Sequence, residues 1–147
     1  MRAVVQRVRK AKVETDGSII SAIDSGLLAL LGVAKGDVDT DAVWIARKLT
    51  SLRIFEDGNG KMNLSVRDVE ADILLISNFT VCADTSRGNR PSFGATGYED
   101  GFRLFNRCAE EIADLWRKPR LGKYGANMRV YLENDGPMTL IVDSRMA

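Results

Sequence analysis

A short polar segment at the end of an apolar run carries the side chains best suited to chemistry. Ser77-Asn78-Phe79-Thr80 directly follows Ile73 to Ile76, a run that is typical of a buried strand. Hydroxyl and amide groups at the end of such a strand must find hydrogen-bond partners. The segment is therefore the first candidate for a functional site.

The absence of histidine limits what any site in this chain can do. None of the 147 residues is His, which excludes a Ser-His-Asp or Cys-His relay, a zinc site built on histidine and an imidazole general base. Catalysis must rely on hydroxyls, carboxylates, main-chain amides, lysine or arginine, or on a group that the substrate brings. We expect neither a metal nor an organic cofactor.

Two ligand-binding patterns begin in the sequence and are not completed. Asp57-Gly58-Asn59-Gly60-Lys61 starts like a calcium loop, but Met62 stands where the loop needs Gly and Asp68 where it needs Glu. Gly60-Lys61 also lacks the other residues of a phosphate loop. We interpret this segment as a surface turn.

Length and charge favour one globular domain spanning residues 1–147. The chain is 45% hydrophobic and carries 21 Lys and Arg against 20 Asp and Glu, a net charge of +1. This balance disfavours coating of nucleic acid through bulk charge. The basic run from Arg117 to Lys123 remains open as a phosphate contact or as a solvated helix end.

Cysteine usage and hydropathy predict a cytoplasmic protein. Cys82 and Cys108 are isolated, which favours two reduced thiols over a disulfide or a redox pair. The longest apolar run, Leu27 to Ala34, is far short of the roughly 20 residues that cross a bilayer, and no secretory signal opens the sequence. We expect no association with a membrane.

Strands are predicted at both ends of the chain. In the first third, β-branched residues and the Asp16-Gly17 hairpin signal predict strands at 3–8, 10–15, 19–23 and 27–33. Near the end, alternating residues predict strands at 128–133 and 138–142, joined by a turn at Asn134 to Pro137.

Apolar residues at helical spacing predict two helices. One carries Ala42, Ile45, Leu49 and Leu52 on a single face, with Asp39, Thr40 and Asp41 at its start. The other carries Phe102, Phe105, Ala109, Ile112 and Trp116, with a capping box from Thr96 to Glu99 and Pro119 as its stop. The prediction is an α/β domain, with two main helices packed on a mostly antiparallel or barrel-like sheet.

Two segments resemble the signature motifs of the D-aminoacyl-tRNA deacylases. Ser77-Asn78-Phe79-Thr80 resembles Ser-Gln-Phe-Thr, and Asn134 to Thr139 resembles Asn-x-Gly-Pro-x-Thr. Other matching segments follow in the family's order: Met1 to Val8, Leu52 to Asp57, Gly60 to Asn63, Arg90 to Phe93 and Gly122 to Ala126. Asn78 departs from the usual Gln, Met138 from a common Val and Asn127 from a frequent Asp.

The resemblance implies an enzyme that hydrolyses the ester between a D-amino acid and the 3′-terminal adenosine of tRNA. It also implies a homodimer with active sites at the subunit interface, where Gly136-Pro137 of one subunit enters the partner's site. If this bond is cis, its carbonyls occupy the place of an L side chain, and Arg7 would hold the motif while Thr139 supports it. Glycyl-tRNA should pass this filter. The sequence by itself leaves a trans Gly-Pro in a plain hairpin turn open.

The resemblance also suggests a role for each residue of the 77–80 segment. Thr80 is a poor nucleophile without an adjacent base, so we expect it to position the substrate while the 2′-hydroxyl of the ribose assists a water molecule. The N–H groups of Phe79 and Thr80 would hold the oxyanion, and Ser77 and Asn78 would orient the strand end and the adenosine. The side chain of Phe79 could serve in packing alone.

Contacts with the tRNA phosphates and two other functions remain open. Lys123, Arg87 and Arg90 are candidates for phosphate contacts, or are solvated surface charges. A relative with a trans Gly-Pro bond would also accept small L-residues such as Ala. A dimeric module that binds RNA ends would release no amino acid.

Overall fold

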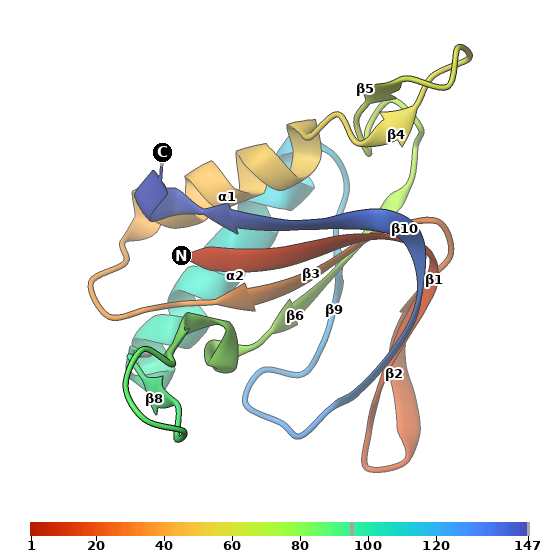
Figure 1. Cartoon of the computed structure of the whole chain (residues 1–147). Helices are drawn as coiled ribbons and strands as arrows, with labels where there is room; N and C mark the ends of the chain where they lie inside the picture. The colour runs from red at the N-terminus through yellow and green to blue at the C-terminus, as the bar shows by residue number, and fades with distance from the viewer. Residues whose placement is uncertain (95, 147) are drawn as a thin grey trace.

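A long strand pair brings the two ends of the chain together. The computed structural model describes residues 1–94 and 96–146. In it β1 (Arg2–Thr15) pairs antiparallel with β10 (Arg129–Asp143) along nearly its whole length, as Figure 1 shows. The other edge of β1 carries β3 (Gly26–Gly32), and β2 (Ser18–Ile23) returns from the turn at Asp16–Gly17. Both turn residues have positive φ, as a tight hairpin requires.

Parallel strands complete the sheet and make it mixed. β6 (Asp72–Ser77) pairs parallel with β3, and β9 (Arg120–Leu121) pairs parallel with β6. The resulting order is β10-β1-β3-β6-β9, with β2 on β1, and the curled sheet nearly closes into a barrel. Because β6 lies between two strands and is covered on both faces, its four central residues, Ile73 to Ile76, are all apolar. The prediction of a barrel-like sheet with two helices is confirmed.

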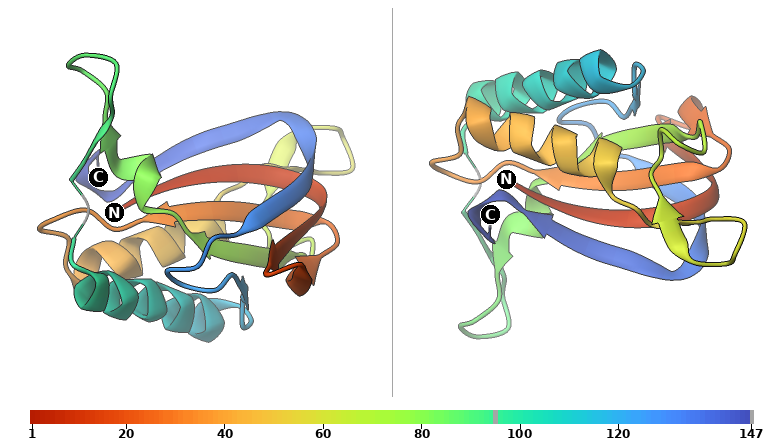
Figure 2. Two further views of the ribbon diagram at one scale, coloured as in Figure 1. Left: turned by 90° about the horizontal axis from the view of Figure 1, so that it is seen from below. Right: turned by 90° about the horizontal axis from the view of Figure 1, so that it is seen from above.

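Both helices cover the same face of the sheet, side by side (Figure 2). They are α1 (Asp39–Ser51) and α2 (Tyr98–Leu115). Alternate residues of β3 face them, with Leu27, Ala29 and Leu31 in the main core. The opposite face holds a second, smaller cluster that contains Val8, Ala11, Val13, Ile23, Leu28, Leu74 and Ile76.

The helix ends differ from the expected caps. The first residue before α2 is Gly97, with no side-chain cap, so the capping box from Thr96 to Glu99 is wrong. The N-cap of α1 is Val38, whose N–H donates to the Asp41 carboxylate at 2.8 Å. Phe102 is 44% exposed and does not belong to the buried face of α2. It packs edge-on against Tyr124, because α2 turns Leu104 and Cys108 toward the core in its place.

The turn expected at Asn134 to Pro137 is wrong. The two predicted strands are one strand, β10, and the break predicted at the ninth residue of β1 does not occur either. Gln6 pairs with Thr139 and Val8 with Asn134, so several residues of β10 bulge outward opposite Arg7. Because β10 pairs with β1 on both sides of the bulge, it remains one strand through a Gly-Pro sequence that by itself indicates a turn.

Short elements connect these parts of the fold. They are β4 (Phe55–Glu56), β5 (Met62–Leu64), η1 (Phe79–Cys82), β7 (Ala83–Asp84), β8 (Ser92–Phe93) and η2 (Ser144–Met146). Among the described residues, no helix has both the length and the apolar composition to span a membrane.

The two cysteines are both free, as expected, and they differ in burial. Cys108 lies in the core with no exposed surface, and burial raises the pKa of its thiol to about 12. The reactive species is the thiolate, which at pH 8 is then only about one part in ten thousand of Cys108.

We predict that iodoacetamide at pH 8 leaves Cys108 unmodified in the folded protein and alkylates it in guanidinium chloride, as mass spectrometry would show. Equal labelling in both states would contradict the burial of Cys108 on α2.

Candidate active site

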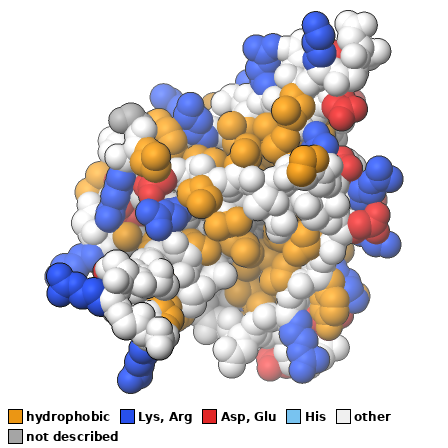
Figure 3. All heavy atoms as spheres, in the orientation of Figure 1, with side chains coloured by type: hydrophobic (Ala, Val, Ile, Leu, Met, Phe, Trp, Pro, Cys, Tyr) orange, Lys and Arg blue, Asp and Glu red, His pale blue; other side chains and the backbone are white. Residues whose placement is uncertain are grey.

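A cavity of about 580 Å³ opens where the end of β6 meets the start of α2 and the 124–128 segment. In Figure 3, which views this face, hydrophobic side chains surround a hollowed centre and cationic side chains lie toward the rim. The cavity is lined by Leu30, Leu31, Val33, Ile76, Ser77, Asn78, Phe79, Thr96, Tyr98, Tyr124, Gly125, Ala126, Asn127, Met128 and Val130. Three of the four residues predicted at the end of β6 therefore border it, and Thr80 does not.

The helical turn η1 is held tightly against the end of β3. The N–H of Asn78 donates to the carbonyl of Leu31 at 2.8 Å, which continues the β3–β6 pairing by one bond. A Cβ on Gly32 would lie 2.5 Å from Val81 and 2.6 Å from Cys82, so only glycine permits this close approach. The backbone at Phe79 and Thr80 is thus fixed relative to the sheet.

Asn78 organises η1 through its side chain. Its Oδ1 accepts the N–H of Thr80 at 3.1 Å and the hydroxyl of Thr80 at 2.6 Å. This is ordinary N-cap chemistry, and asparagine suits it better than the longer Gln that is usual in the motif. The amide oxygen of Asn78 is therefore directed toward Thr80.

These contacts distinguish the two main-chain donors predicted to hold an oxyanion. The N–H of Thr80 already donates to Asn78. The N–H of Phe79 is the first of η1, one of those that a helix leaves without an internal partner. The hydroxyl of Thr80 donates to an amide oxygen, which is no base and cannot activate it as a nucleophile.

An aromatic wall faces η1 across the cavity. Tyr98 and Tyr124 both line it, with ring centroids 5.2 Å apart in an edge-on arrangement. Burial, and after it the neighbouring Tyr98, raises the pKa of Tyr124. Gly101 makes room for this ring, since a Cβ there would lie 2.3 Å from the Tyr124 hydroxyl. Neither tyrosine has a local sequence signal for a functional role, although Tyr124 lies in the 122–126 segment that supports the resemblance.

The Gly136-Pro137 motif bulges from β10, and a buried arginine forms an ion pair with the residue that precedes it. Its peptide bond is cis, and both residues are exposed. Arg7 is buried, and its Nε lies 2.9 Å from the Oδ2 of Asp135 without the alignment of a hydrogen bond. The Arg7 guanidinium also donates to the carbonyl of Ile54. Arg7 thus supports the motif through its neighbour Asp135.

Two amide side chains complete this support. The Nδ2 of Asn134 donates to the carbonyls of Arg7 and Met138, each at 3.0 Å. The Nε2 of Gln6 donates to the hydroxyl of Thr139 at 3.2 Å. Thr139 is thereby tied to β1 two residues after Pro137.

The motif and the 77–80 segment lie at opposite ends of β3 within one chain. Arg7 pairs with Leu27, whereas Asn78 bonds to Leu31. Four residues of a strand separate these points, about 13 Å at about 3.3 Å each. Neither Gly136 nor Pro137 is among the residues that line the cavity.

The basic candidates lie on the surface of the protein. Arg87, Arg90 and Lys123 are all exposed. At the start of the basic run, Arg117 stacks on the Trp116 ring at 4.1 Å and lies 3.3 Å from Asp72, so it has a structural role. Within the described residues, no group of three Cys, Asp or Glu side chains is placed to hold a metal ion.

Comparison with known proteins places this geometry in a family. The family described as D-Tyr-tRNA(Tyr) deacylase matches residues 4–143. A D-aminoacyl-tRNA deacylase of Geobacter sulfurreducens is 49% identical over 99% of this chain and 96% of its own length. One from Clostridium botulinum is 46% identical over 99% of this chain and 98% of its own length.

Solved structures agree with the sequence comparison. The protein titled c-Myc DNA Unwinding Element Binding Protein superposes with a TM-score of 0.92 and 38% identity, covering 97% of this chain and 98% of that one. A probable eukaryotic D-amino acid tRNA deacylase shares the fold at a TM-score of 0.79 and 14% identity, with the same coverage. The chain therefore belongs to the D-Tyr-tRNA(Tyr) deacylase family, the D-aminoacyl-tRNA deacylases that its motifs resemble.

Proposed function

We propose that this protein hydrolyses the ester between a D-amino acid and the 3′-terminal adenosine of tRNA, spares L-aminoacyl-tRNA, and does so as a homodimer. Its family makes it a D-aminoacyl-tRNA deacylase, which is an ester hydrolase. The observation that carries the mechanism is the N–H of Phe79 at the start of η1, which has no hydrogen-bond partner among the described residues and lies beside the cavity of about 580 Å³. The products are a free D-amino acid and a tRNA with its 3′ end restored.

The cavity suits the terminal adenosine. Its volume of about 580 Å³ lies within the range of small-molecule sites. Tyr98 and Tyr124 offer ring faces and edges to a base, which is how proteins commonly hold an unstacked nucleotide. With the base held there, the ribose and its ester would lie toward Ser77 and Phe79.

The reaction needs a water molecule, an oxyanion donor and a means of activating the water. The N–H of Phe79 would donate to the carbonyl oxygen of the ester as negative charge develops on it. Water, oriented by the 2′-hydroxyl of the ribose, adds to the carbonyl carbon. The 2′-hydroxyl relays the proton of the water to the 3′ oxygen as the bond from the carbonyl carbon to that oxygen breaks, which leaves a free carboxylic acid and a 3′-hydroxyl. Thr80 holds Asn78 in place and does not attack the ester.

Selection between D and L would come from Gly136-Pro137 of a second copy. A pocket that gains or loses one methylene discriminates by only about 1–3 kcal/mol. Main chain forms a wall that cannot rotate away, and it would fill the space of an L side chain. A D side chain points out of the site, and glycine has none, so glycyl-tRNA is expected to be hydrolysed too.

Three features support a second copy as the source of this wall. Along the strand direction, the motif and the 77–80 segment of one chain are offset by the four residues from Leu27 to Leu31, about 13 Å. Both motif residues are exposed. The strand that carries them also exposes large hydrophobic side chains, with Tyr131 at 44%, Leu132 at 39% and Ile141 at 70%. Apolar surface of this kind marks interaction sites.

Contacts with the rest of the tRNA would be few. Arg87, Arg90 and Lys123 are exposed and are available to phosphates. The near-neutral net charge accords with recognition that depends mainly on the 3′ end.

Four substrates separate the proposed function from its alternatives. Loss of ester from D-Tyr-tRNA and Gly-tRNA, with L-Tyr-tRNA and L-Ala-tRNA spared, supports the proposal. Hydrolysis of L-Ala-tRNA as well would indicate a wall that admits small L-residues. Binding of all four without ester loss would indicate a module that only binds RNA ends.

The main-chain donor can be tested by substituting Phe79 with proline. Proline is tolerated at the first position of a helix, and Asn78 already has an extended conformation, so the change removes the N–H with little effect on the backbone. We predict that Phe79→Pro lowers kcat on D-Tyr-tRNA by about 10²–10³. Phe79→Ala keeps the N–H and should keep most of the activity. Equal losses in the two variants would assign the role to the phenyl ring.

The positioning role of Thr80 can be tested by an isosteric change. Thr80→Val removes one hydrogen bond to Asn78, which is worth about 0.5–1.5 kcal/mol, so we predict a fall in kcat of at most about tenfold. Single-turnover hydrolysis of D-Tyr-tRNA measures this directly. A near-complete loss of activity would identify Thr80 as the nucleophile.

The ionic support of the motif can be tested at Asp135. Asp135→Asn removes the charge that faces buried Arg7 and loosens the Gly-Pro wall. We predict that the ratio of L-Tyr-tRNA to D-Tyr-tRNA hydrolysis rises by about tenfold. Glu133→Gln is the matched control, since Glu133 lies on the same strand and pairs with exposed Lys10 at 3.3 Å. An unchanged ratio in Asp135→Asn would show that the Arg7–Asp135 ion pair does not contribute to the selection between D- and L-aminoacyl-tRNA.

A further inference from the structure

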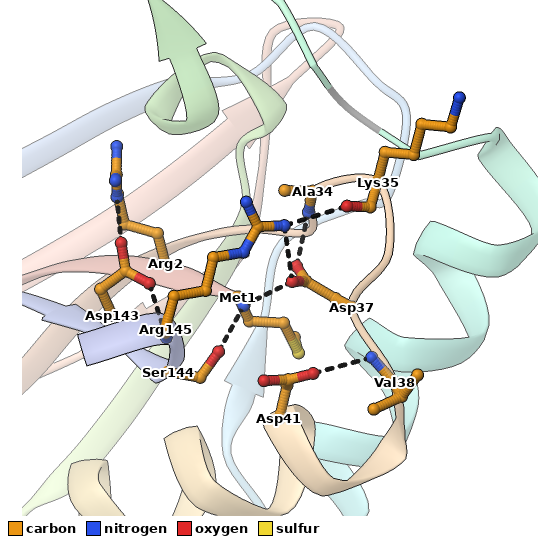
Figure 4. Close-up of polar contacts among 10 residues, drawn as sticks. All are labelled: Met1, Arg2, Ala34, Lys35, Asp37, Val38, Asp41, Asp143, Ser144 and Arg145. Atoms are coloured by element: carbon orange, nitrogen blue, oxygen red, sulfur yellow. Dashed lines mark hydrogen bonds and ion pairs between the residues drawn. The ribbon is translucent and has the colours of Figure 1, made fainter. Parts of the chain in front are cut away.

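A buried ionic cluster joins the two ends of the chain beside one wall of the cavity, and the mechanism above does not use it (Figure 4). Its centre is Asp37, whose side chain is 2% exposed. One carboxylate oxygen, Oδ1, lies 2.9 Å from the amino nitrogen of Met1 and 3.1 Å from Nη2 of Arg145. The amino group of Met1 also donates to the hydroxyl of Ser144 at 2.6 Å.

The second oxygen of Asp37 fixes a main-chain turn. Its Oδ2 accepts the N–H of Ala34 at 2.6 Å, while the N–H of Asp37 donates to the Ala34 carbonyl at 3.2 Å. Arg145 closes the arrangement from outside by donating to the carbonyl of Lys35 at 3.0 Å. The side chains of Asp37 and Arg145 therefore hold the 34–37 turn through the Ala34 N–H and the Lys35 carbonyl.

This turn connects directly to the cavity wall. Val33 precedes it and lines the cavity, and its carbonyl accepts the N–H of Thr96 at 3.4 Å. Lys35 donates its N–H to the carbonyl of Gly94 at 2.9 Å. Thr96 also lines the cavity and leads into Tyr98. A shift of the turn would move this wall relative to the bound nucleoside.

The cluster also adjoins η1. A small cavity of about 60 Å³ lies between them, lined by Met1, Arg2, Ala34, Cys82, Asp143 and Arg145. Cys82 is the last residue of η1. Burial, and after it the negative charge of Asp37, raises the pKa of the Cys82 thiol, which agrees with the close approach of Asp37. The cluster thus contacts the 34–37 turn on one side and adjoins η1 on the other.

A buried carboxylate is stable only when cations and hydrogen-bond donors surround it. The amino group of Met1 belongs to the main chain, whose position β1 fixes through its pairing with β3 and β10. The position of this amino group is therefore fixed by the sheet. Its ion pair with Asp37 fixes the position of the 34–37 turn in the same way.

We propose that Asp37 is a positioning residue for the deacylation reaction. Together with the charged amino group of Met1 and with Arg145, it holds the 34–37 turn and, through Val33 and Thr96, the wall against which the adenosine binds. This inference rests on the proposed function for its effect on the reaction and on the geometry for its effect on the turn.

The experiment compares Asp37→Asn with Asp39→Asn. Asp39 is the matched control because it lies two residues away, is 59% exposed and pairs with surface Arg103. We predict that Asp37→Asn raises KM for D-Tyr-tRNA about tenfold and changes kcat by less than about threefold, at a temperature where it is fully folded. Amide hydrogen exchange should become faster in peptides that contain Lys35 and Thr96 and stay unchanged in the middle of α2. Asp39→Asn should behave as the wild type.

Arg145→Gln is the second variant, since Arg145 is half exposed and its loss leaves the Met1–Asp37 pair in place. Its changes in KM and in exchange should have the same direction and a smaller size. Wild-type KM and wild-type exchange in both variants would overturn the positioning role. If the unmodified protein hydrolyses no D-aminoacyl-tRNA, the proposed function fails, and the exchange measurements still test the turn.

Discussion

The pairing of β1 with β10 is the constraint on which the rest of the structure depends. The first part of β1 turns Ala3 and Val5 toward the helices, and its second part turns Val8 and Val13 toward the opposite face. Arg7 lies at the change between these faces and is buried there. A buried guanidinium must be compensated, and Asp135 and the Ile54 carbonyl do so. The same compensation holds the Gly136-Pro137 bulge away from the sheet.

Because of this strand pairing, the 77–80 segment and the Gly136-Pro137 motif lie at different places along the sheet. β3 pairs with β1 at one edge and with β6 at the other, so it carries the Arg7 support near its start and the 77–80 segment near its end. A strand cannot bring its own ends together, so the segment and the motif of one chain stay apart. The homodimer that we propose would supply each site with both parts.

The sequence predicted elements whose identity depends on local pattern. The apolar run before Ser77 is β6, and the helical spacing of Ile45 and Leu49 marks α1, because burial selects these patterns directly. It failed where tertiary contacts override local signals. Asn134 to Pro137 has the residues of a turn, yet β1 carries it through as one strand.

Side chains brought together from distant segments were also beyond local reasoning. Tyr98 and Tyr124 come from different elements and meet only because Gly101 leaves space for the ring. Asp37 has the sequence context of an ordinary turn residue. Its role depends on Met1 and Arg145, which lie near the two ends of the chain. The motifs pointed to the 77–80 segment that borders the cavity, whereas the residues around it could be found only from the fold.

Mixed dimers test most directly whether the selecting motif acts from the partner subunit. Asp135→Asn chains, which hydrolyse L-Tyr-tRNA in this account, are refolded with a large excess of Phe79→Pro chains, which keep the motif and lack the donor. Each Asp135→Asn chain then pairs with an intact motif. If the motif acts on the partner's site, hydrolysis of L-Tyr-tRNA disappears while that of D-Tyr-tRNA continues. Persistence of L-Tyr-tRNA hydrolysis in the mixture would show that each motif serves its own chain and would contradict the account.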